Sequence, residues 1–309
     1  MITFYKDNRI SKIDTHGVTL MMLRSFLDEN EPKLVYFLQN LWNSQQQAIT
    51  YKQLREAILS GELPVELLEE WQQDYSKFLL LYLQPLWIKA METANKHIEN
   101  RYNTFYFEPM ADGVQQWLQS YGAAFVTNSS QVQLEALNAV IKMATGLEDY
   151  SVDELAKAIR PIVGLNHPQA LANMRYYQTM REYGLSEKKA RDKSIRYAAR
   201  QHRARGYLIA RTELAFAYNK GEYLGIKQAQ QKGILGQMEK VWCTADDERV
   251  CNTCGPMDGK RIPLDDLFDY ETKLADFTRI TPPLHPNCRC GLLYEEVEPP
   301  EPTFLEITF

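Results

Sequence analysis

Five side chains that commonly bind transition metals lie close together near the C-terminal end of the sequence. Cys251 and Cys254 form the stretch CNTC, and 30 residues later His285, Cys288 and Cys290 lie in the stretch HPNCRC. Zn²⁺ prefers four thiolate or imidazole ligands in a tetrahedron, usually from two short-spaced pairs on turns. The two stretches therefore predict a structural zinc site. Cys251 and Cys254 form one pair, and spacing alone excludes none of the other three as the remaining ligands.

Two other roles are compatible with these side chains. They could be small core residues, because unpaired cysteines are often fully buried. They could also belong to a zinc hydrolase or deaminase, which needs an open coordination position and a carboxylate base. Asp246, Asp247 and Glu248, just ahead of the first pair, offer such a base. A lone nucleophilic cysteine is disfavoured because the thiols crowd together, and Cys243, which lies apart from them, is expected in the core.

Composition and charge narrow the classes of protein. The 309 residues are 45% hydrophobic and 24% charged, and the formal net charge of -5 excludes a polycation that coats nucleic acid. The start of the sequence is charged where a secretory signal is apolar. The most apolar run, at 78–88, is about half the length of a membrane span. We therefore expect a chain that folds in a cytoplasm without a membrane, where clustered cysteines bind metal more often than they form disulfides. No GxxxxGK[ST], GxGxxG or HExxH motif is present.

The elements that must position the cysteines follow from proline and apolar spacing. Eight of the 14 prolines lie after residue 255, whereas the region up to about residue 232 has helical periodicity. TYKQ (50–53) and SVDE (151–154) are typical of capping boxes, and Pro85 should kink or split its helix. The expected helices are 18–29, 32–47, 51–60, 64–101, 112–121, 130–145, 152–160, 168–183 and 187–232.

Beyond residue 232 the sequence predicts a different kind of structure. MEKVWCTA (238–245) and CGLLYEEV (290–297) resemble strands, and Asp258-Gly259 between them predicts a tight turn. Such a small module cannot build a large core, so a bound metal would stabilise it. The expected fold is mainly α, with a long-helix N-terminal region and a small C-terminal α+β module stabilised by zinc. The expected regions are a helical N-terminal region at 1–110, a helical middle region at 111–184, the region with the Cys/His module at 185–297, and a flexible acidic tail at 298–309.

A second candidate site is a stripe of positive charge on the last predicted helix. At 100° per residue its members fall within an arc of about 80°, with no acidic residue among them. Such a ridge suits phosphate groups or an acidic protein surface, and the alternative is a solvated helix face. His202, on a different face, is expected at the edge of the core. The stripe consists of Lys189, Lys193, Arg196, Arg200 and Arg203.

Three stretches in succession resemble the C-terminal domain of phage Mu F-like minor head proteins, also called phage head morphogenesis proteins. They are YLIARTELAFAYNKGEY (207–223), VWCTADDERVCNTCGPMDGKRI (241–262) and PPLHPNCRCGLLY (282–294). The resemblance covers about residues 185–297, and the first 180 residues match only in being helical.

The resemblance implies a structural, non-enzymatic minor capsid protein of a tailed phage. Such a protein is present in the host cytoplasm during assembly and in the virion inside the capsid, near the portal vertex. It would act in head assembly and in DNA packaging or delivery, with the portal protein, a major capsid or scaffolding protein and double-stranded DNA as candidate partners. Arg211, Thr212 and Glu213 correspond to the family's helix motif, with a structural role. The alternatives are a zinc-dependent nucleic-acid-processing enzyme and a plain DNA-binding module.

Overall fold

The computed structural model describes residues 15–147, 149–245, 247–248, 250–269 and 279–297. The chain folds into two compact units, each assembled from segments that are distant in sequence. We call them the sheet unit, with Met1–Leu27, Ala90–Glu108 and Ala215–Phe309, and the helical unit, with Asp28–Lys89 and Pro109–Leu214. This grouping does not test the region boundaries expected from the sequence, which stay predictions. The expected acidic tail at 298–309 lies outside the described residues.

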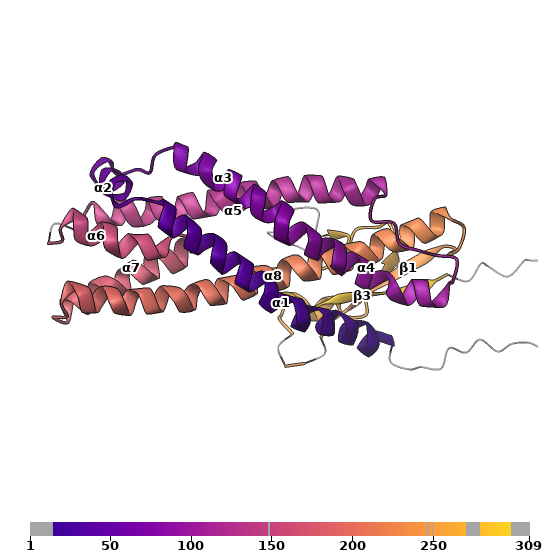
Figure 1. The fold of residues 1–309 in the computed structure, drawn as a ribbon. Helices are drawn as coiled ribbons and strands as arrows, with labels where there is room; N and C mark the ends of the chain where they lie inside the picture. Colours follow the sequence, from indigo (N-terminus) through magenta and orange to yellow (C-terminus); the bar gives the residue numbers. More distant parts are fainter. Residues whose placement is uncertain (1–14, 148, 246, 249, 270–278, 298–309) are drawn as a thin grey trace, which may run out of the picture. The chain divides into compact units, whose positions relative to one another are not determined.

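Helices account for most of the described chain, as the sequence predicts (Figure 1). None of them combines the length and the apolarity of a membrane span. They are α1 (Thr15–Ala48), α2 (Tyr51–Ser60), α3 (Glu66–Phe78), the π-helix η1 (Leu79–Leu83), α4 (Gln84–Arg101), α5 (Asp112–Ala144), α6 (Val152–Ile159), the 3-10 helix η2 (Arg160–Ile162), α7 (His167–Glu182) and α8 (Glu187–Gln231).

The expected break at Pro32 is absent, since α1 continues through this residue. A proline inside a helix costs about 3 kcal/mol because it lacks an N–H donor and its ring crowds the preceding turn. Pro32 itself is exposed, but Leu34, Leu38 and Trp42 repeat every four residues and are fully buried. At about 1.5–3 kcal/mol for each buried side chain, this burial outweighs the cost of the proline.

The expected interruption at Pro85 takes the form of the π-helix η1. Gln84 donates its backbone N–H to Leu79 O, five residues back, directly ahead of the proline that cannot donate. The expected break between 121 and 130 is absent, because α5 is continuous. Its Gly122 serves close packing: a Cβ at this position would lie 2.8 Å from the Leu79 side chain.

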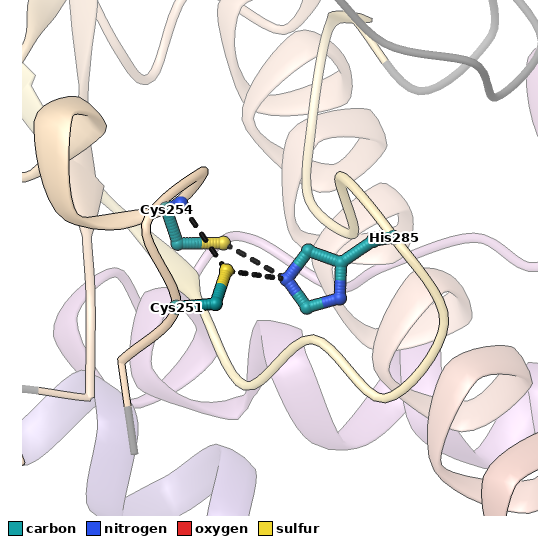
Figure 2. A group of neighbouring side chains, drawn as sticks. All are labelled: Cys251, Cys254 and His285. Atoms are coloured by element: carbon teal, nitrogen blue, oxygen red, sulfur yellow. Dashed lines mark hydrogen bonds between the residues drawn. The ribbon is translucent and has the colours of Figure 1, made fainter. Parts of the chain in front are cut away.

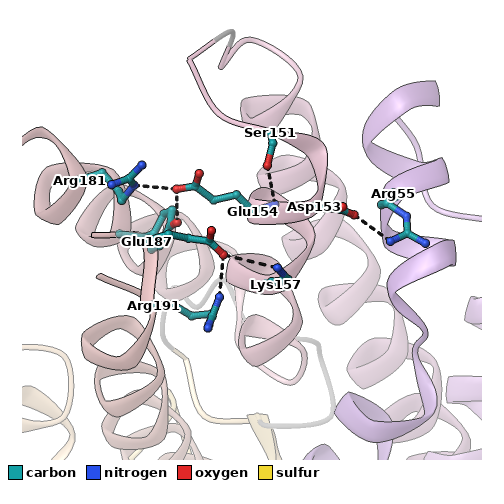
Figure 3. A network of polar contacts seen from close by, with 9 residues as sticks. Arg55, Ser151, Asp153, Glu154, Lys157, Arg181, Glu187 and Arg191 are labelled. Carbon is teal, nitrogen blue, oxygen red and sulfur yellow. Dashed lines mark hydrogen bonds and ion pairs between the residues drawn. The ribbon is translucent and has the colours of Figure 1, made fainter. Parts of the chain in front are cut away.

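A polar network joins α6 to α7 in the helical unit (Figure 3). Ser151 caps α6 by accepting the Glu154 N–H at 3.1 Å, as the SVDE pattern predicts. The Glu154 carboxylate turns away from the cap, however, and accepts hydrogen bonds from the Tyr177 hydroxyl and from Arg181 Nε at 2.7 Å. Burial and the Glu154 carboxylate raise the pKa of Tyr177 above its usual value. The acidic residue of the expected capping box thus holds α7 in place.

Arg211, in the helix motif that resembles the phage family, forms a bidentate ion pair within the helical unit. Its Nε and Nη2 atoms lie 2.7 and 2.9 Å from the two carboxylate oxygens of Glu31, whose side chain is 4% exposed. We predict that Arg211→Ala lowers the free energy of unfolding by about 3 kcal/mol, because it leaves a buried carboxylate unpaired. Denaturant unfolding measures this loss.

Thr212→Ala is the matched control for this prediction. The Thr212 side chain is half-buried and donates to Leu208 O of its own helix, so its loss should change the unfolding free energy by no more than about 0.5 kcal/mol. Equal losses for the Arg211 and Thr212 variants would contradict a structural role of the ion pair.

The sheet unit contains a three-stranded antiparallel sheet of order β2-β1-β3. The strands β1 (Met238–Cys243) and β3 (Gly291–Glu296) confirm the two predicted strands. The strand β2 (Arg261–Pro263) was not predicted, because three residues ending in proline carry little strand signal; it lies at an edge, where proline is tolerated. Gly259, in the predicted turn ahead of β2, has a φ of 72°.

The cysteines lie within a small apolar core of this sheet. Trp242 of β1 and Phe268 pack edge to face with ring centroids 5.0 Å apart, and Leu284 and Leu292 are also buried there. Asn219 of α8 donates to Cys290 O at 3.3 Å, which fixes the start of β3 against the long helix. Cys243 is fully buried, as expected of a core cysteine.

Candidate metal centre

Two turns carry the candidate ligands, and each is closed by one backbone hydrogen bond. In the first, the Cys254 N–H donates to Cys251 O at 3.1 Å; in the second, the Cys288 N–H donates to His285 O at 3.2 Å. Asn287 in the second turn has a φ of 66°, in the left-handed region that asparagine tolerates. Each turn is thus closed by a hydrogen bond from residue i+3 to residue i, which brings its first and last residues together, although the positive φ of Asn287 has no counterpart at Thr253 of the first turn.

The donor atoms of the two turns face one another. His285 Nε2 lies 3.1 Å from Cys251 Sγ and 3.2 Å from Cys254 Sγ (Figure 2), and Cys254 Sγ lies 3.8 Å from Cys288 Sγ. With zinc–sulfur bonds of about 2.3 Å, two thiolates of a tetrahedral site lie about 3.8 Å apart. The Cys254–Cys288 separation therefore fits two thiolates on one ion, and the two His285 separations are a few tenths of an ångström shorter than the value of about 3.5 Å that a tetrahedral site gives.

The five candidates form two overlapping groups that share Cys254. One group is Cys251, Cys254 and His285, and the other is Cys254, Cys288 and Cys290; within each, the donor atoms lie within 4.8 Å of one another. The structure thus brings all five sequence-predicted positions into a cluster that could hold a metal ion.

The His285 ring is oriented to offer Nε2 to a metal. Its Nδ1 lies 2.8 Å from Pro286 O, and because a carbonyl only accepts, Nδ1 carries a proton. Burial disfavours the imidazolium, but this hydrogen bond and the Cys288 and Cys251 thiolates raise the pKa of His285 above its usual value. The cluster therefore favours a positive charge next to Nε2, where the Cys251 and Cys254 sulfurs lie. Metal-bound histidines are typically held in this way by a carbonyl on the other ring nitrogen.

The thiols of the second group do not ionise alike. The Cys254 and Cys290 thiols and the Cys290 backbone N–H donate to Cys288, which places the pKa of Cys288 well below its usual value. The hydrogen bond to Cys288 raises the pKa of Cys254. A negative charge is thus already favoured in the cluster, and a cation would stabilise further thiolates.

The carboxylates ahead of the first turn do not form an evident base. Asp247 accepts two hydrogen bonds from Arg289, at 2.6 and 2.7 Å, so its carboxylate is neutralised by a guanidinium. Glu248 is exposed, and Asp246 lies outside the described residues. The Asp247–Arg289 pair joins the chain ahead of the CNTC turn to the HPNC turn. Its role is therefore to hold the two turns together, which sequence spacing did not reveal.

The five residues of the basic stripe belong to α8, and all five are exposed. His202 is buried and lies 2.8 Å from both Ala198 O and Val163 O, so it belongs to the core. Burial lowers the pKa of His202 below its usual value.

The C-terminal part of the chain is thus a long helix followed by a three-stranded sheet that carries a cluster of cysteines and one histidine. Residues 151–293 match the family described as Phage Mu protein F like protein. This part of the chain is therefore a phage Mu F-like region, and it includes the basic stripe and all five Cys/His positions. The match begins next to α6, upstream of the stretch 185–297 that resembles the family in its motifs. The family is one of structural phage head proteins. No curated protein and no solved structure matches the chain significantly.

Proposed function

We propose that the protein is a structural minor head protein of a tailed phage, associated with the portal and acting in head assembly and in DNA packaging or delivery. The observation that carries this proposal is the phage Mu F-like match over residues 151–293. A structural role agrees with the ion pair that occupies Asp247, since this carboxylate is one of the three candidate bases of a zinc enzyme.

In this proposal one structural Zn²⁺ has Cys251, Cys254, His285 and Cys288 as ligands. It holds together the three-stranded sheet and the two turns, which we call the sheet module. The two turns supply one pair each, and a closed set of four ligands leaves no coordination position for catalysis. The apolar core of the module is small, so the metal contributes directly to its folding. Cys290, at the start of β3, is the fifth member of the cluster and is left as a neutral thiol.

The proposed location is the interior of the capsid near the portal vertex, with the portal protein and a major capsid or scaffolding protein as partners. Cross-linking of purified phage heads, followed by identification of the linked peptides, tests this location. We expect links between this chain and the portal protein, and the same links in heads emptied of DNA if the protein is not ejected. Absence of the chain from purified heads, or links to tail proteins alone, would overturn the proposal.

A further inference from the structure

Part of the basic stripe lines a pocket that the sequence did not reveal. The pocket lies in the helical unit, has a volume of about 380 Å³, and is lined by Tyr176 of α7 with Lys193, Arg196 and Arg200 of α8. Small-molecule sites have volumes of about 300–1,000 Å³, so the pocket is large enough for a phosphate and its neighbouring group.

Buried polar contacts fix the two helices that form the pocket. Asn173 of α7 donates to Ser194 O at 3.2 Å and to Gln201 Oε1 at 2.9 Å. Gln201 in turn donates to Gln169 O at 3.0 Å. Asn173 lies one turn from Tyr176, and Ser194 follows Lys193, so these contacts hold the pocket walls in register. The pocket is therefore preorganised by side chains that do not line it.

The three cations of the pocket have no acidic partner in the described part of the chain. Elsewhere in the helical unit, Arg55, Arg181 and Arg191 each form an ion pair with a carboxylate (Figure 3). Lys193, Arg196 and Arg200 are exposed, and none of the ion pairs among described residues includes them. Three like charges converging on one pocket produce a positive potential that attracts a multivalent anion.

Aromatic rings support this positive surface. The rings of Tyr176 and Tyr197 lie 5.1 Å apart, and the Arg200 guanidinium lies 5.7 Å from the centre of the Tyr197 ring. Guanidinium groups bind phosphate oxygens through paired N–H donors. An aromatic wall beside such cations also suits the sugar and base that adjoin a phosphate.

We propose that this pocket binds a phosphodiester group of nucleic acid, and that the outer stripe residues Lys189 and Arg203 contact the neighbouring phosphates. These two residues are 14 positions apart, which is about 21 Å along a helix with a rise of 1.5 Å per residue. That length equals the axial rise of about six nucleotides of one DNA strand, so the stripe is long enough to reach more than one phosphate. The inference rests on the proposed function for its biological setting, since a head protein lies beside packaged DNA, but binding itself can be measured without phage.

The test uses the full chain and a fluorescently labelled 30-base-pair duplex at several salt concentrations. We expect Arg196→Glu and Arg200→Glu each to lower affinity about 10-fold, and Arg196→Gln to reduce the slope of log affinity against log salt by about one. Lys188→Glu is the matched control: Lys188 is exposed on the same helix outside the stripe, and its reversal should change affinity less than about 3-fold. If charge reversal at Arg196 and at Arg200 leaves the affinity for the duplex unchanged, the proposal is wrong.

Further probes identify the source of the phosphate. A single strand of the same sequence distinguishes single-stranded from duplex ligands, and binding to either supports the proposal. Tight binding of inorganic pyrophosphate without binding of either oligonucleotide would overturn it in favour of a small phosphorylated ligand. Equal binding of hexaglutamate would overturn it in favour of an acidic protein partner. A chain that binds DNA through this pocket but is absent from phage heads would refute the proposed function alone.

Discussion

Replacing Cys288 with serine is expected to abolish stoichiometric zinc binding and to unfold the sheet module, whereas Cys290→Ser should retain one zinc per chain. Cys288 closes a turn with the same backbone hydrogen bond as the CNTC turn, and its sulfur lies 3.8 Å from Cys254 Sγ. Structural zinc contributes about 10–16 kcal/mol of apparent binding free energy in small domains, so loss of one of four ligands removes a large part of the stability of the module. Cys290 is as buried as Cys288, which makes the two variants matched in lost packing.

The measurements are zinc content by mass spectrometry of the metal and the near-ultraviolet circular dichroism of Trp242, which lies in the core of the module. Addition of a strong chelator to the unmodified protein should reproduce the spectrum of Cys288→Ser. If Cys288→Ser retains zinc and Cys290→Ser loses it, then Cys290 is the ligand and Cys288 is not. Protein purified in zinc-containing buffer that holds no metal would show that the cysteines are core packing.

Sequence spacing predicts that five Cys/His positions lie close together, but it does not show which four of them are the ligands. The relevant information lies in backbone hydrogen bonds: the Cys288 N–H donates to His285 O as the Cys254 N–H donates to Cys251 O. The contact between the Pro286 carbonyl and His285 Nδ1, which sets the tautomer of His285, could not be predicted from the sequence for the same reason. Residue types indicate which atoms can bind a metal, whereas turn geometry determines which of them point the same way.

The helical fold was predictable where local signals and burial agree. The TYKQ capping box predicts the first residue of α2, and the structure contains both of its hydrogen bonds. Local signals were wrong where tertiary contacts compete with them. Pro32 does not end α1, because the side chains that follow it are buried, and Glu154 leaves its expected cap for partners on α7. A single sequence does not show these contacts, because the partners lie far away along the chain.

The same limit applies to the basic stripe. Helical periodicity places its five residues on one face of α8, and all five are exposed. The pocket, however, requires Tyr176 from a different helix, positioned by Asn173 and its contacts to α8. Periodicity within one helix therefore predicts a surface but not a site.

Glu213 should make the stability of the protein depend on pH around neutrality. One of its carboxylate oxygens accepts a hydrogen bond from the Tyr121 hydroxyl at 3.2 Å, and the other has no hydrogen-bond partner among the described residues. The surroundings are apolar, since Tyr121 stacks on Trp117 with centroids 5.0 Å apart and Trp87 lies beside both. Burial raises the pKa of Glu213 from 4.5 to about 8, against the opposing effect of the Tyr121 hydrogen bond.

The direction of the pH effect follows from this raised pKa. Between about pH 4.5 and pH 8 the folded state holds a proton on Glu213 that the unfolded state has lost, so unfolding releases a proton. The stabilising contribution is complete below the unfolded pKa and is lost as the pH rises through about 8. At about 1.4 kcal/mol per pKa unit, a rise from 4.5 to about 8 corresponds to a loss of about 5 kcal/mol.

Glu213→Gln should remove this dependence, because glutamine is neutral at every pH and keeps the shape of the protonated acid. We expect the variant to be no more stable than the unmodified protein near pH 4.5, and more stable by about 5 kcal/mol near pH 9. Denaturant unfolding of both proteins across this range measures the difference, and comparing the two cancels the titration of all other groups. Tyr121→Phe is the control: it removes the hydrogen bond that favours the ionised form, so it should extend the pH dependence to higher pH and increase the total loss. A constant difference between Glu213→Gln and the unmodified protein from pH 4.5 to pH 9 would show that this carboxylate ionises as it does in water.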